Sequence, residues 1–320
     1  MWQCLLYSVT SVFRVLQSPL GDEGVKLKLW FLETRPQFLT LSLVLAFLGA
    51  SIAWYDGYFN IGYALLAGFG LLLTHISVNT LNDYFDYRSG VDLATKRTPF
   101  SGGSGILPAA LLTPKQVFWL GMSSFLIAVG VGVFFLLTRG WLLLPLLLVA
   151  AVCILFYTPV ILKMPWPEWT AGLGLGTLPI LGLYFVQAAQ YTWHAAIAAI
   201  PSGILVHNLL LLNEFPDTEA DGRAGRRTLP IIMGGSRASF VYSAFAIAVY
   251  LWIIGWVIAG QMPAFALISL LTLPFAIKAI NGSRKYQDMA KLVPALASNV
   301  LVVLITQLLL GLGYILARVI

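Results

Sequence analysis

Long apolar runs recur along the whole of this 320-residue chain, and they constrain the fold more than any other feature. Each run holds roughly 18–22 residues, enough for a helix to cross about 30 Å of hydrocarbon. The sequence therefore predicts an all-α, polytopic membrane protein of nine transmembrane helices, with residues 1–320 forming a single transmembrane domain. The nine runs cover residues 38–55, 61–81, 116–137, 141–161, 170–188, 195–212, 238–259, 264–280 and 295–317.

Charged residues are scarce and unevenly placed. They make up 10% of the chain against 59% for hydrophobic residues, far from the composition of soluble globular domains. All of the 19 Lys and Arg residues except Arg139 and Arg318 fall on alternate loops. This positive-inside pattern predicts a cytoplasmic or interfacial amino-terminal segment, residues 1–36, whose first 16 residues resemble an interfacial amphipathic helix. The net charge of +6 thus reflects membrane topology, and we expect no nucleic-acid partner.

Acidic residues cluster at the cytoplasmic end of the second run, in the segment NDYFDYRSGVD. If the helix continues past this end, Asn82 and Asp86 lie about 40° apart around its axis, and Asp83 shares their face. His75 and Asn79 lie below them on the same helix, although His75 is more typical of a core histidine than of a ligand. The sequence predicts a group of amide and carboxylate oxygens at this helix end.

A second acidic cluster, NEFPDTEADGR, follows the sixth run and echoes the first. Asn213, Asp217 and Asp221 recur every four residues, so they form one stripe if the segment stays helical. The downstream Arg-Thr and Gly-Gly-Ser sequences also recur at a similar spacing. The chain therefore resembles two four-helix repeats plus a final helix, arranged around a central cavity with the site between the repeats.

The two clusters together point to a metal-bound diphosphate. Carboxylates crowded in a partly dry cavity need a cation or protons to neutralise them. Carboxylate and amide oxygens, without nearby Cys or His, suit Mg²⁺. Bases and glycines that match phosphate oxygens follow each cluster, in KRTPFSGGSG at 96–105 and GRAGRRTLPIIMGG at 222–235. We expect Mg²⁺ as the cofactor.

At these residues the sequence resembles the UbiA superfamily of intramembrane prenyltransferases, and the likeness spans essentially the whole chain. Within that superfamily it is most similar to the branch that acts on 1,4-dihydroxy-2-naphthoate in the menaquinone pathway. The branch's first motif is matched by Asn82, Asp86, Gly90 and Asp92. Its second motif, D-x-x-x-D, is matched by Asp217 and Asp221, and Arg35-Pro36 matches the entry to the first span.

The resemblance implies a function and a set of site residues. An allylic prenyl diphosphate would bind through Mg²⁺, ionise, and alkylate an aromatic quinone precursor similar to dihydroxynaphthoate, beneath an Asp-lined cap on the cytoplasmic side of the cell membrane. The expected catalytic residues are Asp83, Asp86, Asp217 and Asp221. The same four, with Asp92, are the expected metal ligands. The expected substrate-binding residues are Asn82, Lys96, Arg97, Tyr157, Lys163, Asn213, Arg226 and Arg227. The expected partners are the two substrates and the bilayer, with no obligate protein partner.

Two departures from the branch pattern bear on the acceptor. Leu175 stands where the branch carries an acid after Gly-Leu-Gly, and Glu214 replaces an Asn. A prenyltransferase with another lipid or aromatic acceptor is therefore an alternative. An ion-coupled transporter shares the repeats and the membrane acids, but it needs no paired diphosphate cradle. A CDP-alcohol phosphotransferase would need further Asp residues that this chain lacks.

Overall fold

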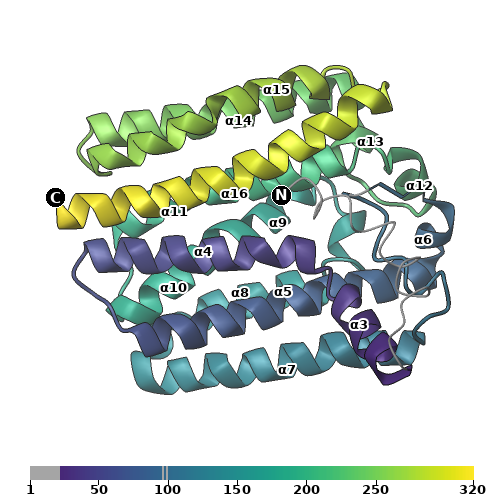
Figure 1. Cartoon of the computed structure of the whole chain (residues 1–320), viewed down its shortest axis with the longest axis horizontal. Helices are drawn as coiled ribbons and strands as arrows, with labels where there is room; N and C mark the ends of the chain where they lie inside the picture. The colour runs from purple at the N-terminus through teal and green to yellow at the C-terminus, as the bar shows by residue number, and fades with distance from the viewer. Residues whose placement is uncertain (1–21, 96, 99) are drawn as a thin grey trace.

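The protein is a bundle of helices that run nearly parallel to its long axis (Figure 1). The structure, a computed structural model, describes residues 22–95, 97–98 and 100–320, and no strand occurs within these ranges. Eight of the described helices are long and apolar enough to cross a membrane, which confirms the predicted all-helical, multi-pass class. They are α4 (Pro36–Tyr55), α5 (Ile61–Ser89), α7 (Pro114–Arg139), the continuous α9–η3–α10 (Glu168–Ala188), α11 (Trp193–Asn213), α14 (Gly235–Ile258), the continuous η4–α15 (Ala264–Ser283) and α16 (Met289–Val319). The amphipathic helix expected over residues 1–16 lies outside the described ranges.

The fourth expected span is shorter than predicted. The helix expected over 141–161 consists of η1 (Trp141–Leu143) and α8 (Leu144–Leu155), and it ends six residues early. Pro159 explains the early end, because a proline disfavours helical backbone at the residue before it. The chain turns instead and continues into the short helix η2 (Ile161–Lys163). This turn brings Tyr157 to the end of the bundle that holds both acidic clusters.

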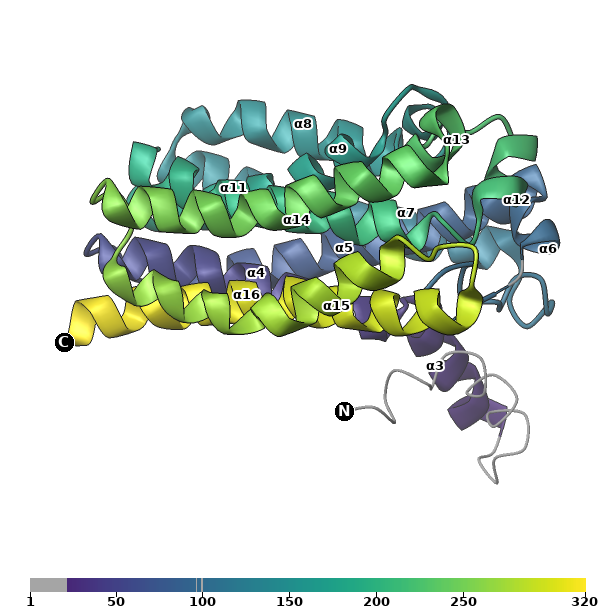
Figure 2. The ribbon, with the colours of Figure 1, turned by 90° about the horizontal axis from the view of Figure 1, so that it is seen from above.

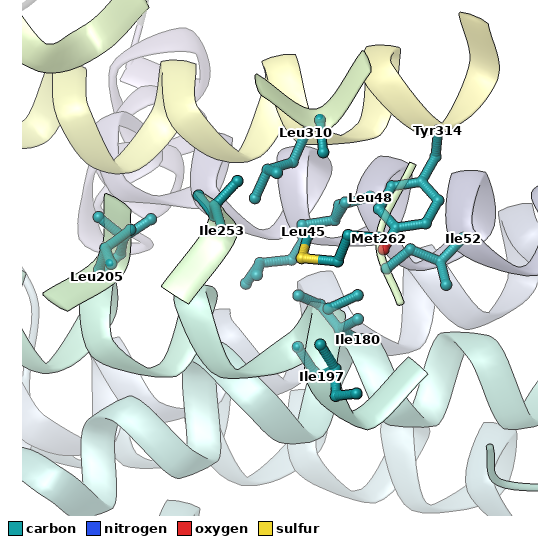
Figure 3. Close-up of a cluster of buried hydrophobic side chains, with 14 of the residues drawn as sticks. Leu45, Leu48, Ile52, Ile180, Ile197, Leu205, Ile253, Met262, Leu310 and Tyr314 are labelled. Carbon is teal, nitrogen blue, oxygen red and sulfur yellow. The ribbon is translucent and has the colours of Figure 1, made fainter. Parts of the chain in front are cut away.

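Helices α4 and α11 form the middle of the bundle. Helix α4 packs against α5, α10 and α16, and α11 packs against α9, η3, α14 and α16 (Figures 1 and 2). The core between them is apolar and contains side chains from helices far apart in the sequence (Figure 3). It includes Leu45, Leu48, Ile52, Ile180, Ile197, Leu205, Ile253, Leu310 and Tyr314. Since lipid is as apolar as these side chains, close packing between helices holds such a bundle together.

Glycines bring one pair of helices into close contact. The segment α9 (Glu168–Gly172), η3 (Leu173–Thr177) and α10 (Leu178–Ala188) contains a π-helical stretch at η3. A Cβ on Gly172 would lie 2.5 Å from the Gly203 carbonyl oxygen of α11, and one on Gly176 would lie 2.6 Å from that of Ser202. No larger residue fits at this crossing without displacing backbone. Helix α9 is therefore held directly against α11.

Short helices gather at one end of the bundle, on the right of Figure 1. They are α3 (Asp22–Glu33), α6 (Val91–Ala94), α12 (Thr218–Arg223) and α13 (Leu229–Met233). Both acidic clusters of the sequence lie among them, at the ends of α5 and α11. The fold thus places the two clusters at one end of the same bundle.

Candidate active site

A polar cavity of about 170 Å³ lies between the ends of α5 and α11. It brings together residues of both acidic clusters. Its polar lining includes Arg35, Asn82, Asp86, Asp92, Tyr157, Asn213, Glu214, Asp217, Asp221 and Arg226. Hereafter this cavity is called the polar cap. Of the thirteen residues that the sequence assigned to the site, eight line it.

The first motif lies on an unbroken helix. Helix α5 runs two turns past the predicted span, to Ser89, and ends where Gly90 adopts the left-handed conformation at φ 81°. The Asn82 amide donates a hydrogen bond to Asp86 Oδ2 at 3.0 Å and another to the Thr158 hydroxyl, also at 3.0 Å. Asp86 is therefore oriented by a neighbour one turn earlier on the same helix.

Asp83 lies behind the polar cap and does not line it. Its Oδ2 accepts the Ser104 backbone N–H at 2.8 Å, and the Ser104 hydroxyl donates to Glu33 at 2.7 Å. Burial, followed by the charge of Asp83, raises the pKa of Glu33 to about 9. Burial, followed by the charges of Asp83 and Asp86, raises the pKa of Asp92 to about 8. The expectation that Asp83 shares the helix face on which Asp86 lines the cavity is therefore wrong. The Asp83 carboxylate instead binds the backbone of the glycine-rich loop at 102–105.

Arg35 is a site residue that the sequence did not single out as one. It has the left-handed backbone conformation φ 56°, ψ 59°, which is strained for a residue with a side chain and is typical of functional positions. The guanidinium lies 3.5 Å from Asp83 Oδ1 and donates to Asn82 Oδ1 at 3.4 Å. The signal available in the sequence was the Arg35-Pro36 pair that precedes the first span.

The second motif lies at a break in the helix. The condition for a continuous stripe is not met, because α11 ends at Asn213 and α12 starts only at Thr218, with Pro216 in the turn between them. Asp217 Oδ1 and Asn213 Oδ1 are buried without a hydrogen-bond partner among the described residues. Burial, followed by the charge of Asp221, raises the pKa of Asp217 to about 7. Asp221 also has a raised pKa, of about 6, mainly because it is buried.

Arg226 joins the two motifs. One guanidinium nitrogen donates to Asp221 Oδ1 at 2.7 Å, and the other forms an ion pair with Asp86 Oδ1. The Arg226 side chain is only 12% exposed. A buried cation between two buried carboxylates compensates part of their mutual repulsion.

The other expected bases lie outside the cavity. Lys163, Arg97 and Arg227 are exposed at the surface, although the backbone of Arg227 pairs with Leu162 and Trp166. Lys96 lies outside the described residues. The structure therefore separates Arg226 from Arg97, Lys163 and Arg227.

Two further cavities adjoin the polar cap. One, of about 300 Å³, is almost entirely apolar and lies between α5, α7, α8, η3 and α10. Hereafter it is called the apolar cavity, and it shares Arg35, Asn82, Tyr157 and Leu210 with the polar cap. The other, of about 150 Å³, lies between α4, α11 and α16, and it also reaches Leu210. Leu210 thus marks the point where all three cavities meet.

The residues of the polar cap fit Mg²⁺ by their chemistry. The available donors are carboxylate and amide oxygens, and the partnerless Asp217 Oδ1 and Asn213 Oδ1 are free to bind a cation. Among the described residues, however, no three His, Cys, Asp or Glu side chains stand close enough together to hold a metal ion as they are. Arg226 contacts two of the carboxylates that would have to converge on a cation.

Comparisons with known proteins agree with this architecture. The UbiA prenyltransferase family profile matches residues 42–316. The 1,4-dihydroxy-2-naphthoate octaprenyltransferase of Bacillus subtilis is 31% identical over 258 residues, which cover 79% of this chain and 81% of that protein.

Solved structures show the same fold. A UbiA homologue from Aeropyrum pernix superposes with a TM-score of 0.67 at 18% identity, over 88% of this chain and 98% of its own. Another, from Archaeoglobus fulgidus and bound to DMAPP and Mg²⁺, gives a TM-score of 0.59 at 13% identity, over 86% and 98% of the two chains. From the family profile and the naphthoate relative, we conclude that the chain belongs to the UbiA prenyltransferase family.

Proposed function

We propose that this prenyltransferase moves a polyprenyl group from an allylic prenyl diphosphate to an aromatic quinone precursor similar to dihydroxynaphthoate, with release of diphosphate. The observation that carries the proposal is the direct junction of the polar cap with the apolar cavity. A prenyl diphosphate has a charged head and a long apolar tail, and these two spaces match the two parts. The bond that breaks, between C1 and the diphosphate oxygen, would lie at the junction near Asn82 and Tyr157.

The carboxylates of both motifs would hold Mg²⁺ with the diphosphate. Asp86, Asp217 and Asp221 line the polar cap together with Asp92, and Asp83 supports them from behind. When bound, Mg²⁺ would neutralise the charge of the leaving diphosphate and so assist ionisation.

The chain's own cations and amides would hold the diphosphate oxygens. Arg226 and Arg35 are the guanidinium groups that line the cap, and Asn82 and Asn213 supply amides. Their donors would stabilise the negative charge that develops as the C1–O bond breaks. Lys96, Arg97, Lys163 and Arg227 would act at the rim, where they attract the anionic substrate before it enters.

The prenyl tail would occupy the apolar cavity. The acceptor would occupy the third cavity, which is the one of about 150 Å³ between α4, α11 and α16. The apolar cavity is walled by Leu, Val, Ala and Gly side chains, with Phe135 at its far end from the cap. The third cavity contains the polar side chains of Gln37, His75 and Asn79, which suit an acceptor that carries hydroxyl or carboxyl groups. Because the two cavities meet at Leu210, the nucleophilic carbon of the acceptor can approach C1 there.

We also propose the finer topology. Segment η1–α8 would be a ninth membrane crossing between the third and fifth spans, which gives two four-helix repeats and a final helix. The positive-inside pattern would place the amino terminus and the polar cap on the cytoplasmic side of the cell membrane. The apolar surface of α8, which has no buried residue, suits contact with lipid.

The acceptor assignment is supported by the naphthoate prenyltransferase relative from Bacillus subtilis. The test is product identification by mass spectrometry. Membranes containing the protein receive a prenyl diphosphate with dihydroxynaphthoate or one of a panel of other aromatic and lipid acceptors. We expect a prenylated naphthoquinol product that disappears with excess EDTA and returns with Mg²⁺. Transfer only to a different acceptor would overturn the acceptor, and full turnover in EDTA would overturn the metal-assisted mechanism.

A further inference from the structure

Two buried histidines of the bundle differ in how their ring nitrogens are used. His207 of α11 is 4% exposed, and both of its nitrogens have partners: Nε2 accepts the Trp166 indole N–H at 2.9 Å, and Nδ1 lies 3.3 Å from Asn208 Oδ1. His75 of α5 is 3% exposed, and among the described residues only its Nδ1 has a partner, the Ser42 hydroxyl at 2.8 Å. Packing therefore accounts for His207, whereas His75 keeps one ring nitrogen free.

The free nitrogen of His75 faces the third cavity. His75 lines this cavity from the middle of a membrane-spanning helix. Its Nε2 has no partner among the described residues, and yet the surrounding protein atoms do not enclose it. Because the rest of the side chain is buried, the open surface of Nε2 belongs to the cavity that the residue lines. A polar side chain that faces a cavity at membrane depth is typical of a functional position.

The Ser42 hydroxyl determines which proton the His75 ring carries. Ser42 is fully buried on α4, and its hydroxyl has no other partner among the described residues. A buried O–H group needs an acceptor, so the hydroxyl donates to Nδ1, and the proton of the neutral ring lies on Nε2. His75 therefore presents an N–H donor to the third cavity.

Asn79 presents the opposite kind of group from the same face of α5. Its amide nitrogen donates to the Thr34 carbonyl oxygen at 3.1 Å. Because a carbonyl oxygen can only accept, this bond fixes the orientation of the amide and leaves Oδ1 as the free atom. Asn79 lines the third cavity, and protein atoms do not enclose its Oδ1. Residues four apart on a helix are neighbours, so a donor and an acceptor lie side by side in this cavity.

We propose that His75 and Asn79 together recognise a phenolic hydroxyl group of the aromatic acceptor. The hydroxyl oxygen accepts the His75 Nε2–H, and the hydroxyl group donates its own proton to Asn79 Oδ1. A carboxylate oxygen could accept from His75, but it would then face Asn79 Oδ1 with no proton to share. This inference rests on the proposed function and names the acceptor group that the third cavity selects. Ser42 is the positioning residue, because it sets the tautomer of His75.

The place of the pair along α5 agrees with the proposed meeting of the substrates. Asn79 lies three residues before Asn82, and His75 lies seven before it, which is about 4.5 and 10 Å along a helix. Asn82 lines the junction of the polar cap with the apolar cavity, and Leu210 lines all three cavities. A hydroxyl group held between His75 and Asn79 thus lets the ring extend toward the reacting C1.

The test compares the binding of two probes that differ by one hydroxyl group, 4-hydroxy-2-naphthoate and 2-naphthoate. Titration calorimetry gives both dissociation constants for the purified full-length protein, without prenyl diphosphate or metal, so that no transfer occurs. The variants are His75→Leu, His75→Gln, Asn79→Leu and Ser42→Ala, and His207→Leu is the matched buried control. Melting temperature and the KM of each substrate are also measured. If His75→Leu does not fold, the double variant with Ser42→Ala replaces it, because no hydroxyl is then left without a partner.

We expect the parent to bind the hydroxylated probe at least about tenfold more tightly than 2-naphthoate. His75→Leu and Asn79→Leu reduce this ratio to within about twofold of one, because either change leaves the hydroxyl group one hydrogen bond short and the other residue unpaired. They raise the KM of the acceptor but leave that of the prenyl diphosphate within about twofold. His75→Gln keeps part of the ratio because its amide can still donate, and Ser42→Ala loses less than His75→Leu.

The control separates recognition from stability. His207→Leu strands the Trp166 indole N–H, so it should lower the melting temperature and keep the parent's ratio of the two dissociation constants.

Three results would overturn the inference. A parent that binds both probes equally has no hydroxyl recognition. An unchanged ratio in folded His75→Leu and Asn79→Leu assigns the hydroxyl to other residues. Equal weakening of both probes shows that the two side chains only shape the cavity. Failure of the proposed function looks different, because the parent protein would then prenylate no aromatic acceptor, and the inference would fall with it.

Discussion

The two acidic motifs resemble each other in sequence and differ in structure. The first lies on the unbroken helix α5, where Asn82, Thr158 and Ser104 hold its carboxylate and amide groups by hydrogen bonds. The second lies at the break between α11 and α12, and its Asp217 and Asn213 keep oxygens without partners among the described residues. Similar side chains are therefore oriented at one end of the site and left free at the other.

This difference indicates that the two motifs have different roles in cation binding. A hydrogen-bonded carboxylate on a rigid helix is pre-organised, so it defines where a cation would bind. Partnerless oxygens on a turn can adjust, so they can complete the coordination when metal and diphosphate arrive. Arg226 bridges the two ends in the structure and belongs to neither.

Removal of that bridge should have the largest effect. Arg226→Gln leaves the buried Asp86 and Asp221 without their shared cation, and breaking a buried ion pair costs about 3–5 kcal/mol. In the proposed function it also removes a donor to the diphosphate, and such a loss typically lowers the rate about 10²–10³-fold. We expect a strong fall in both melting temperature and transfer. The control is Lys163→Gln, at an exposed residue, which should change the rate only a few-fold. Equal losses of transfer in the two variants would show that Arg226 in the polar cap is no more important than the exposed bases outside it.

Stability should separate the motifs from each other. Asp86→Asn removes one partner of the Arg226 pair and should destabilise the fold by about 3 kcal/mol. Asp217→Asn replaces a buried carboxylate that has a partnerless oxygen, so it should leave the melting temperature unchanged or raise it. The measurement is thermal unfolding of both variants in detergent without divalent metal. Destabilisation of similar size in both would show that the second motif is as firmly held as the first.

The dependence on pH should be smaller and should follow the raised pKa values. The pKa is about 7 for Asp217, about 6 for Asp221 and about 8 for Asp92. Because each lies above that of an unfolded Asp, the stability of the metal-free protein is greatest at low pH and decreases as pH rises through 6–8. Mg²⁺ binds the ionised form, so its affinity should increase over the same range, by about tenfold per pH unit for each proton displaced. Titration calorimetry at pH 6, 7 and 8 checks the sign, and an affinity independent of pH would contradict the assigned ligands.

The fold class, the membrane helices and the family were predictable from the sequence. Apolar run length and the two polar motifs are informative however the helices pack. A membrane helix must be long enough to span the bilayer, and clustered carboxylates must be neutralised. The family match confirms a prenyltransferase rather than a transporter or a CDP-alcohol phosphotransferase. The helix end at Leu155 was missed because apolar run length does not register the effect of Pro159. The sixth span ends within one residue of its predicted end, at Asn213, and Pro216 follows in the turn before α12.

Much of the candidate site depends on tertiary contacts that no local pattern contains. Asp83 is turned toward the loop by Ser104, and α9 lies against α11 only because Gly172 and Gly176 leave room for the α11 backbone. Arg226 differs from Arg227 by one position, yet only one of them enters the cap. Sequence spacing identified two segments that the fold brings to one cavity, but it could not assign the individual side chains within them.

The central claim is that both motifs act on one diphosphate as a single unit. The most direct measurement is prenyl transfer at saturating Mg²⁺ by Asp86→Asn, Asp217→Asn and the double variant, each shown to be folded. We predict that either single substitution removes most of the activity, by about 100-fold or more, and that the double variant loses little further, because residues that act together are strongly non-additive. A folded single variant with near-normal turnover, or losses that simply multiply in the double variant, would contradict the claim.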